Sequence, residues 1–376
     1  MAEYYRTTYT TERRQKRSRS IVGTLLDVVM FLVSLVVVGA FILTLFVPTI
    51  DPRNHGFLST LGHVAPFVYA AQVVITLYWV VRWRLWIAVP MILISLFGIG
   101  GLSTFYKIEV SRSYGEKSYE RSALKIMSYN VRSFIDDKGE RRLDSIAMFV
   151  KKANPDILCF QEMGFSELAD SLLRPLQPMP KSLSRVDLSP AIYSRYPIIK
   201  AHRVDSIKNF VWVDMVIRDD TIRVFNNHLQ SATIQHEDIA YIENHEYIAD
   251  EEWSELRSVV DRLSKNNKLR AAQVDSLRVL IDASPYPTIV CGDFNDTPVS
   301  YTYRKMSKGF TDAFREVGRG FSHTFKGFFG MLRIDYVLSS DEFEPLSYEA
   351  VDSVKYSDHH PVFVRLRYNG KNNYPI

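Results

Sequence analysis

The stretch of sequence that decides the fold is a short apolar run that ends in polar residues, Val290-Cys291-Gly292-Asp293-Phe294-Asn295-Asp296-Thr297-Pro298. The apolar run is typical of a buried strand, and the glycine and the proline are residues at which a strand ends. Asp293 and Asn295 stand two positions apart, so in an extended backbone their side chains share one face. A carboxylate and a carboxamide placed together can bind one small polar substrate group. The alternative interpretation is an Asx turn that only caps the strand.

The charge of the chain is unevenly distributed along its 376 residues. Residues 1–100 contain nine basic and four acidic residues, which leaves 37 basic and 38 acidic residues for the rest of the chain. This balance excludes the strongly basic domain that is typical of a general nucleic-acid binder. The only cysteines, Cys159 and Cys291, lie in apolar runs. We expect them to be small buried hydrophobic residues rather than a disulfide or a metal site.

Three long apolar runs in the first third of the chain predict transmembrane helices, at Val28–Val47, Phe57–Val81 and Leu85 to about Tyr106. Each run is about as long as the ~20 residues that a spanning helix needs. Pro66 and Pro90 lie inside the second and third runs, and spanning helices tolerate proline better than soluble ones. A cleavable signal peptide fits poorly because three runs follow one another. The alternative is a buried hairpin of a soluble core.

The basic residues predict the orientation of these helices in the membrane. A dense basic tail precedes the first run, and Arg82 and Arg84 lie between the second and third runs. The positive-inside rule places both segments in the cytoplasm. We therefore expect an integral protein of the cytoplasmic membrane, held in the lipid bilayer, whose last domain lies on the extracytoplasmic side. Its parts would be a cytoplasmic tail (1–20), a three-helix membrane anchor (21–106), a tether (107–121) and a catalytic domain (122–376).

From Leu124 onward, apolar strands alternate with amphipathic helices, which predicts an α/β fold. Arg218–Thr221 has the residues of a hairpin turn. The expected strands are 124–131, 157–162, 191–193, 211–217, 222–229, 288–291, 334–338 and 361–364, and the expected helices are 143–150, 251–263 and 269–281.

Polar side chains stand at or near the ends of these strands: Asn130, Glu162, His228, Asp293, Asn295, Asp335, Asp358 and His359. Each alone has a structural interpretation, such as a surface acid, a turn residue or a hydrogen-bonded core histidine. Because burying unpaired charges is costly, we expect these groups to converge on one another and on a cation. Oxygen donors without cysteine favour magnesium, manganese or calcium over a structural zinc.

Six segments that contain these residues resemble, in order, the motifs of the endonuclease/exonuclease/phosphatase superfamily: 128–132 (SYNVR), 160–162 (FQE), 226–229 (NNHL), 292–295 (GDFN), 333–336 (RIDY) and 357–362 (SDHHPV). The resemblance covers about Lys125 to Leu366 and says nothing about the apolar runs. It implies a two-sheet α/β sandwich with the active site at one edge. It also implies a divalent-metal-dependent phosphoester hydrolase, with Glu162 as the principal metal ligand and Asn130 and Asp358 in the same cluster.

The same resemblance implies roles for the other strand-end residues. His359 would be the general base or a phosphate-binding imidazole, oriented by Asp335. Asp293 and Asn295 would position the attacking water and the phosphoryl oxygens, and His228 would contact the phosphate from the opposite side. A cation that neutralises developing charge and a base that activates water suit the hydrolysis of an anionic ester.

His359 precedes a second histidine, and only one of two adjacent residues in an extended segment can face the site. The family pattern Ser-Asp-His-x-Pro-Val assigns His359 to the site and leaves His360 pointing away.

Several alternatives stay open on sequence grounds. The chain could be a nuclease acting on DNA or RNA, or a membrane scaffold that has lost catalysis, because one fold serves many functions. An acidic insertion at 231–256 would repel a long polyanion, which favours a small or lipid-linked phosphoester over long duplex DNA. Arg195, Lys326 and Arg333 are additional candidates for phosphate contacts.

Overall fold

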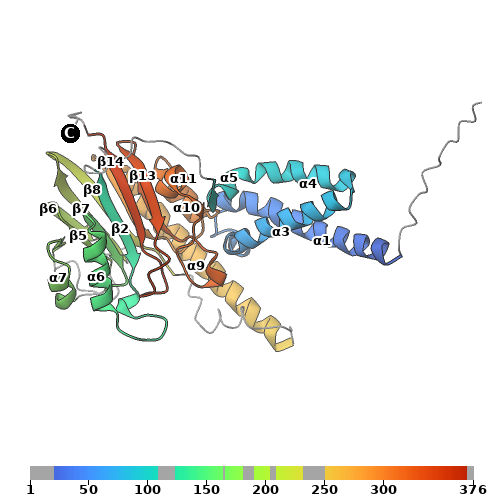
Figure 1. The fold of residues 1–376 in the computed structure, drawn as a ribbon, viewed down its shortest axis with the longest axis horizontal. Coiled ribbons are helices and arrows are strands. Elements are labelled where there is room, and N and C mark those ends of the chain that lie inside the picture. Colours follow the sequence, from blue (N-terminus) through green and yellow to red (C-terminus); the bar gives the residue numbers. More distant parts are fainter. Residues whose placement is uncertain are drawn as a thin grey trace, which may run out of the picture.

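A helical bundle lies beside an α/β sandwich, and the two parts are in contact (Figure 1). The computed structural model describes residues 21–108, 123–163, 166–180, 190–203, 209–231 and 250–370. The basic tail, most of the predicted tether and most of the acidic insertion lie outside the described residues.

Three antiparallel helices form the bundle: α1 (Ile21–Phe46), α3 (Leu61–Val81) and α4 (Leu85–Phe97). The 3-10 turn η1 (Val47–Thr49) and the short helix α2 (Gly56–Ser59) connect α1 to α3. Polar groups join the helices, because Trp79 Nε1 donates to Ser34 Oγ at 2.7 Å and Gln72 Nε2 donates to Ser95 Oγ at 3.1 Å.

Two helices of this bundle are long and apolar enough to cross a membrane, within Ile21–Thr49 and Leu61–Val81. The prediction of three such helices was wrong in this respect, because α4 has only 13 residues and continues after a turn at Gly98 as α5 (Ile99–Leu102). The glycine allows close packing: a Cβ atom at Gly98 would lie 2.4 Å from the Phe41 ring. A residue with a side chain at this position would have favoured a continuous helix, because glycine is a poor helix former.

Two six-stranded sheets form the sandwich, as the sequence predicted. The first has the order β13 (Phe343–Ala350), β14 (Val362–Tyr368), β2 (Leu124–Asn130), β3 (Ile157–Gln161), β5 (Ala191–Ser194), β4 (Gln177–Pro178). The second has the order β10 (Thr311–Asp312), β12 (Asp335–Ser339), β9 (Thr288–Asp293), β8 (Asp220–His228), β7 (Phe210–Ile217), β6 (Ile198–Arg203).

Helices cover the outer faces of the sandwich. The first sheet carries α6 (Leu143–Ala153) and α7 (Glu167–Leu172), and the second carries α9 (Asp250–Asp282) and α10 (Tyr301–Met306), with α11 (Ala313–Val317) beside β13. The two helices predicted at 251–263 and 269–281 are one helix, α9, because no glycine or proline interrupts the segment between them. Cys159 and Cys291 are free and buried between the sheets, as predicted.

The strand topology brings the predicted site residues to one edge of the sandwich. β2 and β3 are parallel, as are β8 and β9, so their carboxyl ends meet at this edge. β12 and β14 run antiparallel to them and begin at the same edge. Residues at the ends of the parallel strands therefore face residues at the start of the antiparallel ones.

The bundle is joined to the sandwich by a small two-stranded sheet of β1 (Tyr106–Lys107) and β11 (Gly320–Phe321). The tether predicted from residue 107 therefore begins in regular structure, and residues 109–122 lie outside the described part.

Candidate active site

Unusual backbone angles aim the polar side chains at the sheet edge. Glu162 directly follows β3 with φ = 52°, and Asn295 follows β9 with φ = 52°. Such angles are strained for residues other than glycine and cluster at functional sites. Gly292, at φ = 132°, is required by close packing as well, because a Cβ atom there would lie 2.0 Å from the carbonyl oxygen of Asn227 in β8.

Two carboxylates, one amide and one imidazole form the first part of the site. Nδ2 of Asn130 lies 3.1 Å from both Glu162 Oε1 and Asp293 Oδ2. Nε2 of His228 lies 3.3 Å from the same Glu162 oxygen and 3.9 Å from Asp293 Oδ2. These residues come from the ends of β2, β3, β8 and β9, so the structure brings together four of the predicted positions.

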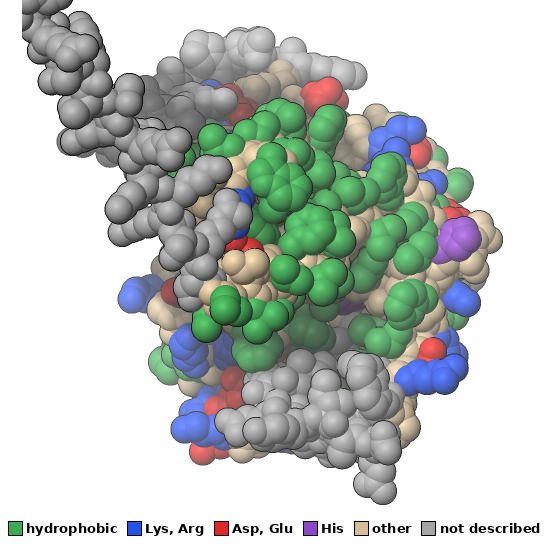
Figure 2. All heavy atoms as spheres, turned by 90° about the vertical axis from the view of Figure 1, so that its right-hand side faces the viewer, with side chains coloured by type: hydrophobic (Ala, Val, Ile, Leu, Met, Phe, Trp, Pro, Cys, Tyr) green, Lys and Arg blue, Asp and Glu red, His purple; other side chains and the backbone are tan. Residues whose placement is uncertain are grey.

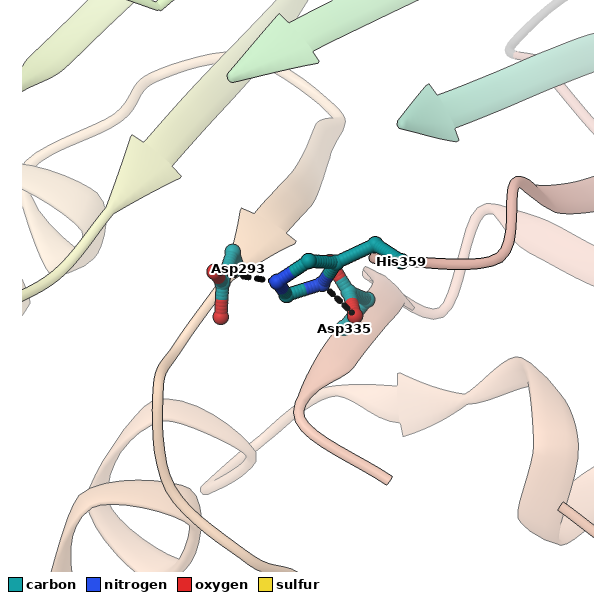
Figure 3. A group of neighbouring side chains, drawn as sticks. All are labelled: Asp293, Asp335 and His359. Atoms are coloured by element: carbon teal, nitrogen blue, oxygen red, sulfur yellow. Dashed lines mark hydrogen bonds and ion pairs between the residues drawn. The ribbon is translucent and has the colours of Figure 1, made fainter. Parts of the chain in front are cut away.

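The second part of the site is an imidazole between two buried carboxylates (Figure 3). Nδ1 of His359 lies 2.9 Å from Asp335 Oδ2, and Nε2 of the same ring lies 3.8 Å from Asp293 Oδ2. Asp335 opens β12, Asp293 ends β9, and His359 precedes β14. An imidazole in this position can exchange a proton at Nε2 while its other nitrogen is fixed by Asp335.

The charged side chains of this group shift one another's pKa values. Burial and the negative charge of Asp335 raise the pKa of Asp293 to about 6, although His359 and His228 act in the opposite direction. Burial alone would lower the pKa of His359, but the charges of Asp335 and Asp293 outweigh it and raise this pKa to about 10. The described arrangement therefore favours a protonated imidazole that faces a carboxylate able to titrate near neutral pH.

Asn295 is held rigidly beside Asp293. Its backbone N–H donates to Asp293 Oδ1 at 2.8 Å, and its side-chain amide donates to Asp293 Oδ2 at 3.2 Å and to the carbonyl of Leu229 at 3.1 Å. The Asx turn that was the alternative interpretation is therefore present, and both of its polar side chains also lie in the candidate site.

Three supporting residues were not expected from the sequence. Arg270, fully buried in α9, donates to the carbonyl oxygen of Asn295. The hydroxyl of Thr324 accepts from the backbone N–H of Asp335 at 3.1 Å, and the Phe325 ring packs 5.1 Å from the ring of His359. No local pattern marks them, because their roles depend on packing between distant segments.

The adjacent histidines have opposite orientations. His360 packs against His323 with ring centroids 5.2 Å apart, and burial together with nearby positive charge lowers its pKa to about 4. The strand register predicted from the sequence is the one that the structure has, with His359 facing Asp335.

Asp358 lies at the rim of this group. Its Oδ2 is 3.6 Å from Arg132 Nε, and its Oδ1 accepts from Ser357 Oγ at 3.2 Å. The contacts of this carboxylate are thus with Arg132 and Ser357, and its role as a metal ligand stays a prediction. Lys326 lies nearby, since its Nζ contacts the Ser357 carbonyl and Asp137.

The other two candidate phosphate contacts lie elsewhere. Both Nη atoms of Arg333 donate to Asp312, at 3.1 and 2.8 Å, and its side chain is fully buried among aromatic rings. Arg195 pairs with Asp156 at 3.2 Å, at the start of β3 and hence at the opposite edge of the sheet. Both arginines stabilise the fold rather than the site.

The donor atoms at the sheet edge suit a hard divalent cation. Glu162 and Asp293 contribute carboxylate oxygens, and cysteine is absent from the set. The Asn130 amide lies between them with its Nδ2, while its Oδ1 accepts from the backbone N–H of Arg132 at 3.0 Å. Asp293, Asp335 and His359 also offer ligand atoms within 4.8 Å of one another, but Asp335 is already bonded to the imidazole. Oxygen-rich sets of this kind favour magnesium, manganese or calcium.

Comparisons with known proteins agree with this description. The model of the Endonuclease/Exonuclease/phosphatase family matches residues 127–359, and that of a domain of unknown function (DUF8431) matches residues 27–105. No curated protein matches the chain.

Solved structures that are similar to the chain include these three. A Bacteroides thetaiotaomicron protein of this family is 18% identical (68% of this chain, 98% of that chain, TM-score 0.46). A mannosyl-6-phosphatase from the same organism is 20% identical (65% and 100%, TM-score 0.44). Truncated Caenorhabditis elegans TDP2 is 20% identical (65% and 97%, TM-score 0.44).

The family match spans well over half of the chain, from β2 to the histidine before β14, and contains every residue of the site. The chain therefore belongs to the endonuclease/exonuclease/phosphatase family, whose members are hydrolases that act on phosphoesters.

Proposed function

We propose that this protein is a membrane-anchored hydrolase that cleaves a phosphoester with the help of a divalent metal ion. The observation that carries the proposal is the imidazole of His359 fixed between Asp335 and Asp293, beside the Glu162 and Asn130 side chains. An imidazole that is hydrogen-bonded to a carboxylate in this way can donate or accept a proton, and the oxygen atoms of the neighbouring side chains can hold a cation.

Glu162 and Asn130 would hold the ion, and Asp358 is proposed as a further ligand. The bound ion would neutralise charge that develops on the phosphoryl oxygens. His228, whose Nε2 lies 3.3 Å from Glu162 Oε1, would donate to a phosphoryl oxygen from the other side of the site.

Of the two roles predicted for His359, the charge distribution favours the phosphate-binding one. Two carboxylates flank the ring and raise its pKa to about 10, so it is protonated near neutral pH and can donate from Nε2. Asp293 has a pKa of about 6 and can accept the proton of an attacking water that Asn295 helps to orient. In this proposal the general base is Asp293 and not His359.

The bundle is proposed as a membrane anchor with its catalytic domain on the extracytoplasmic side. Arg82 and Arg84 bind the Asp27 carboxylate at 2.8 and 2.5 Å, at the end of the bundle away from the sandwich (Figure 1). The basic residues and the catalytic domain thus lie at opposite ends of the bundle. The positive-inside rule then assigns the basic end of the bundle to the cytoplasm, and the opposite end, with the catalytic domain, to the extracytoplasmic side.

A panel of substrates tests the proposed reaction against the two alternatives. The full chain in detergent with magnesium should hydrolyse p-nitrophenyl phosphate or bis-p-nitrophenyl phosphate, and more slowly cut duplex DNA or single-stranded RNA. Faster cleavage of either nucleic acid would identify a nuclease. Hydrolysis of none of the four would support the inactive scaffold.

A further inference from the structure

The loop that carries Asp293 and Asn295 contacts the start of α3 through the residues that follow them. Thr297 Oγ1 donates to the carbonyl oxygen of Gly62 at 2.8 Å, and Asp296 Oδ1 lies 3.9 Å from Nε2 of the buried His63. Asp296 and Thr297 are the two residues that directly follow Asn295 in the chain. The first turn of the bundle helix therefore lies directly behind the site.

A second set of contacts joins the same loop to the segment before α3. Arg270 donates to the carbonyl of Asn295 and, at 2.7 Å, to Asn267 Oδ1. Asn267 in turn donates to Ser59 Oγ of α2 at 2.8 Å. This chain of buried hydrogen bonds runs from the bundle to the backbone of the site.

A third contact comes from the loop that supports His359. Phe325 packs on the His359 ring, and four residues later Phe329 packs edge-on against Phe67 of α3, with centroids 5.8 Å apart. Phe329 nevertheless has 58% of its surface exposed. An exposed phenylalanine on a loop beside an apolar helix is typical of a side chain that enters a bilayer interface.

The surface of the bundle near the sandwich is apolar. Val64, which precedes Phe67 in α3, is exposed, as are Phe46, Phe57 and Leu102 at the ends of the neighbouring segments. Figure 2, which views the molecule from the bundle end, shows hydrophobic side chains covering the bundle with charged side chains around its periphery. Because α3 starts at the sandwich, Phe67 and its partner Phe329 lie farther along the helix than Val64. Phe329 therefore lies beside the apolar first turns of α3.

We propose that the active site lies at the level of the lipid head groups and takes a phosphoester carried on a membrane lipid, with the loop Phe325–Leu332 inserted at the bilayer surface. This inference rests on the membrane-anchored hydrolase proposed above. Water would add to phosphorus, the ester P–O bond would break, and the leaving oxygen would take up a proton, so one water is consumed per bond. A substrate held in the same surface would reach the site without leaving the bilayer.

The position of the loop can be measured independently of activity. The full chain carrying Phe329→Cys is reconstituted in phosphatidylcholine vesicles and labelled with a nitroxide, since both native cysteines are buried. The matched control is Ile199→Cys on β6, which is equally exposed (59%) and lies on the far side of the sandwich from the bundle (Figure 1). We expect the label at 329 to be accessible to oxygen and shielded from a water-soluble nickel complex, with the reverse at 199. A label at 329 that is as accessible to nickel as the control would overturn the proposed location.

The substrate class is tested with esters that differ only in chain length. Hexadecyl and ethyl p-nitrophenyl phosphate form the diester pair, and hexadecyl and butyl phosphate form the monoester pair, each presented with phosphatidylcholine vesicles. For the ester type that is cleaved, we expect kcat/KM to be at least ten times higher for the hexadecyl compound. Phe329→Asp should reduce this long-to-short ratio about tenfold, whereas Ile199→Asp should leave the ratio unchanged.

The outcomes separate this inference from the proposed function. Equal rates for the long and short esters, or a ratio that Phe329→Asp does not change, would overturn the lipid substrate while leaving the hydrolase intact. Hydrolysis of none of the four esters would overturn both, even if the nitroxide places residue 329 in the bilayer.

Discussion

The substitution Asp335→Asn tests the role assigned to His359. Oδ2 of Asp335 lies 2.9 Å from Nδ1 of His359 in a buried site, and asparagine keeps the shape of the side chain without its charge. The pKa of His359 should therefore fall from about 10 toward its ordinary value of 6.5. A hydrogen bond to a charged group contributes about 1.5–3 kcal/mol. Losing that interaction in the transition state corresponds to a roughly 10- to 150-fold lower kcat/KM near neutral pH.

The assay is the pH dependence of kcat/KM for the full chain at saturating magnesium. The proposed chemistry needs Asp293 deprotonated and His359 protonated, so the wild-type rate should fall below about pH 6 and above about pH 10. Removing the Asp335 charge lowers the pKa of both groups, and the alkaline limb should move to lower pH by at least about one unit. If His359 were the general base, only the acidic limb would move. An alkaline limb that stays at its wild-type position would refute the reasoning.

Four further predictions follow from individual contacts. Glu162→Gln should lose most activity, and added magnesium should restore it only partly, because Glu162 is the most accessible carboxylate of the proposed metal set; wild-type turnover would contradict this. His359→Ala should cost ~10²–10⁴-fold in kcat, whereas His360→Ala, facing His323, should stay within a few-fold; the reverse order would mean that the register is wrong. Gly292→Ala should lower the melting temperature, because its Cβ would meet the Asn227 carbonyl; unchanged thermal unfolding would disprove the packing. An alkaline phosphatase fused after the last residue should be active and a green fluorescent protein fused there should be dark; fluorescence without phosphatase activity would reverse the topology.

The residue pattern was sufficient to predict an α/β fold and the convergence of the site, whereas the two-sheet sandwich was implied by the family resemblance. Alternating apolar runs indicate strands regardless of their partners, and polar residues at strand ends meet when parallel strands share an edge. Asn130, Glu162, His228 and Asp293 converge for this reason, and the adjacent histidines follow the period of an extended chain.

What the sequence could not predict depends on contacts between distant segments. The single helix α9 lacks a breaker, but two separate amphipathic stretches suggested two helices. Asp358 contacts Arg132, a pairing fixed by how two loops fold over the sheet edge rather than by either motif. The contact of Thr297 with Gly62 joins residues 235 positions apart, so no local pattern could have shown that the bundle supports the site.

The most direct test of the central claim is phosphoester hydrolysis by the purified full chain before and after removal of divalent metal. The wild-type protein should hydrolyse p-nitrophenyl phosphate or bis-p-nitrophenyl phosphate with magnesium, lose activity in excess EDTA, and regain it when magnesium is restored. Glu162→Gln, purified and folded to the same extent, should regain little under the same conditions. Activity that is undiminished in EDTA, or equal recovery by Glu162→Gln, would contradict the metal site proposed for Glu162, Asn130 and Asp358.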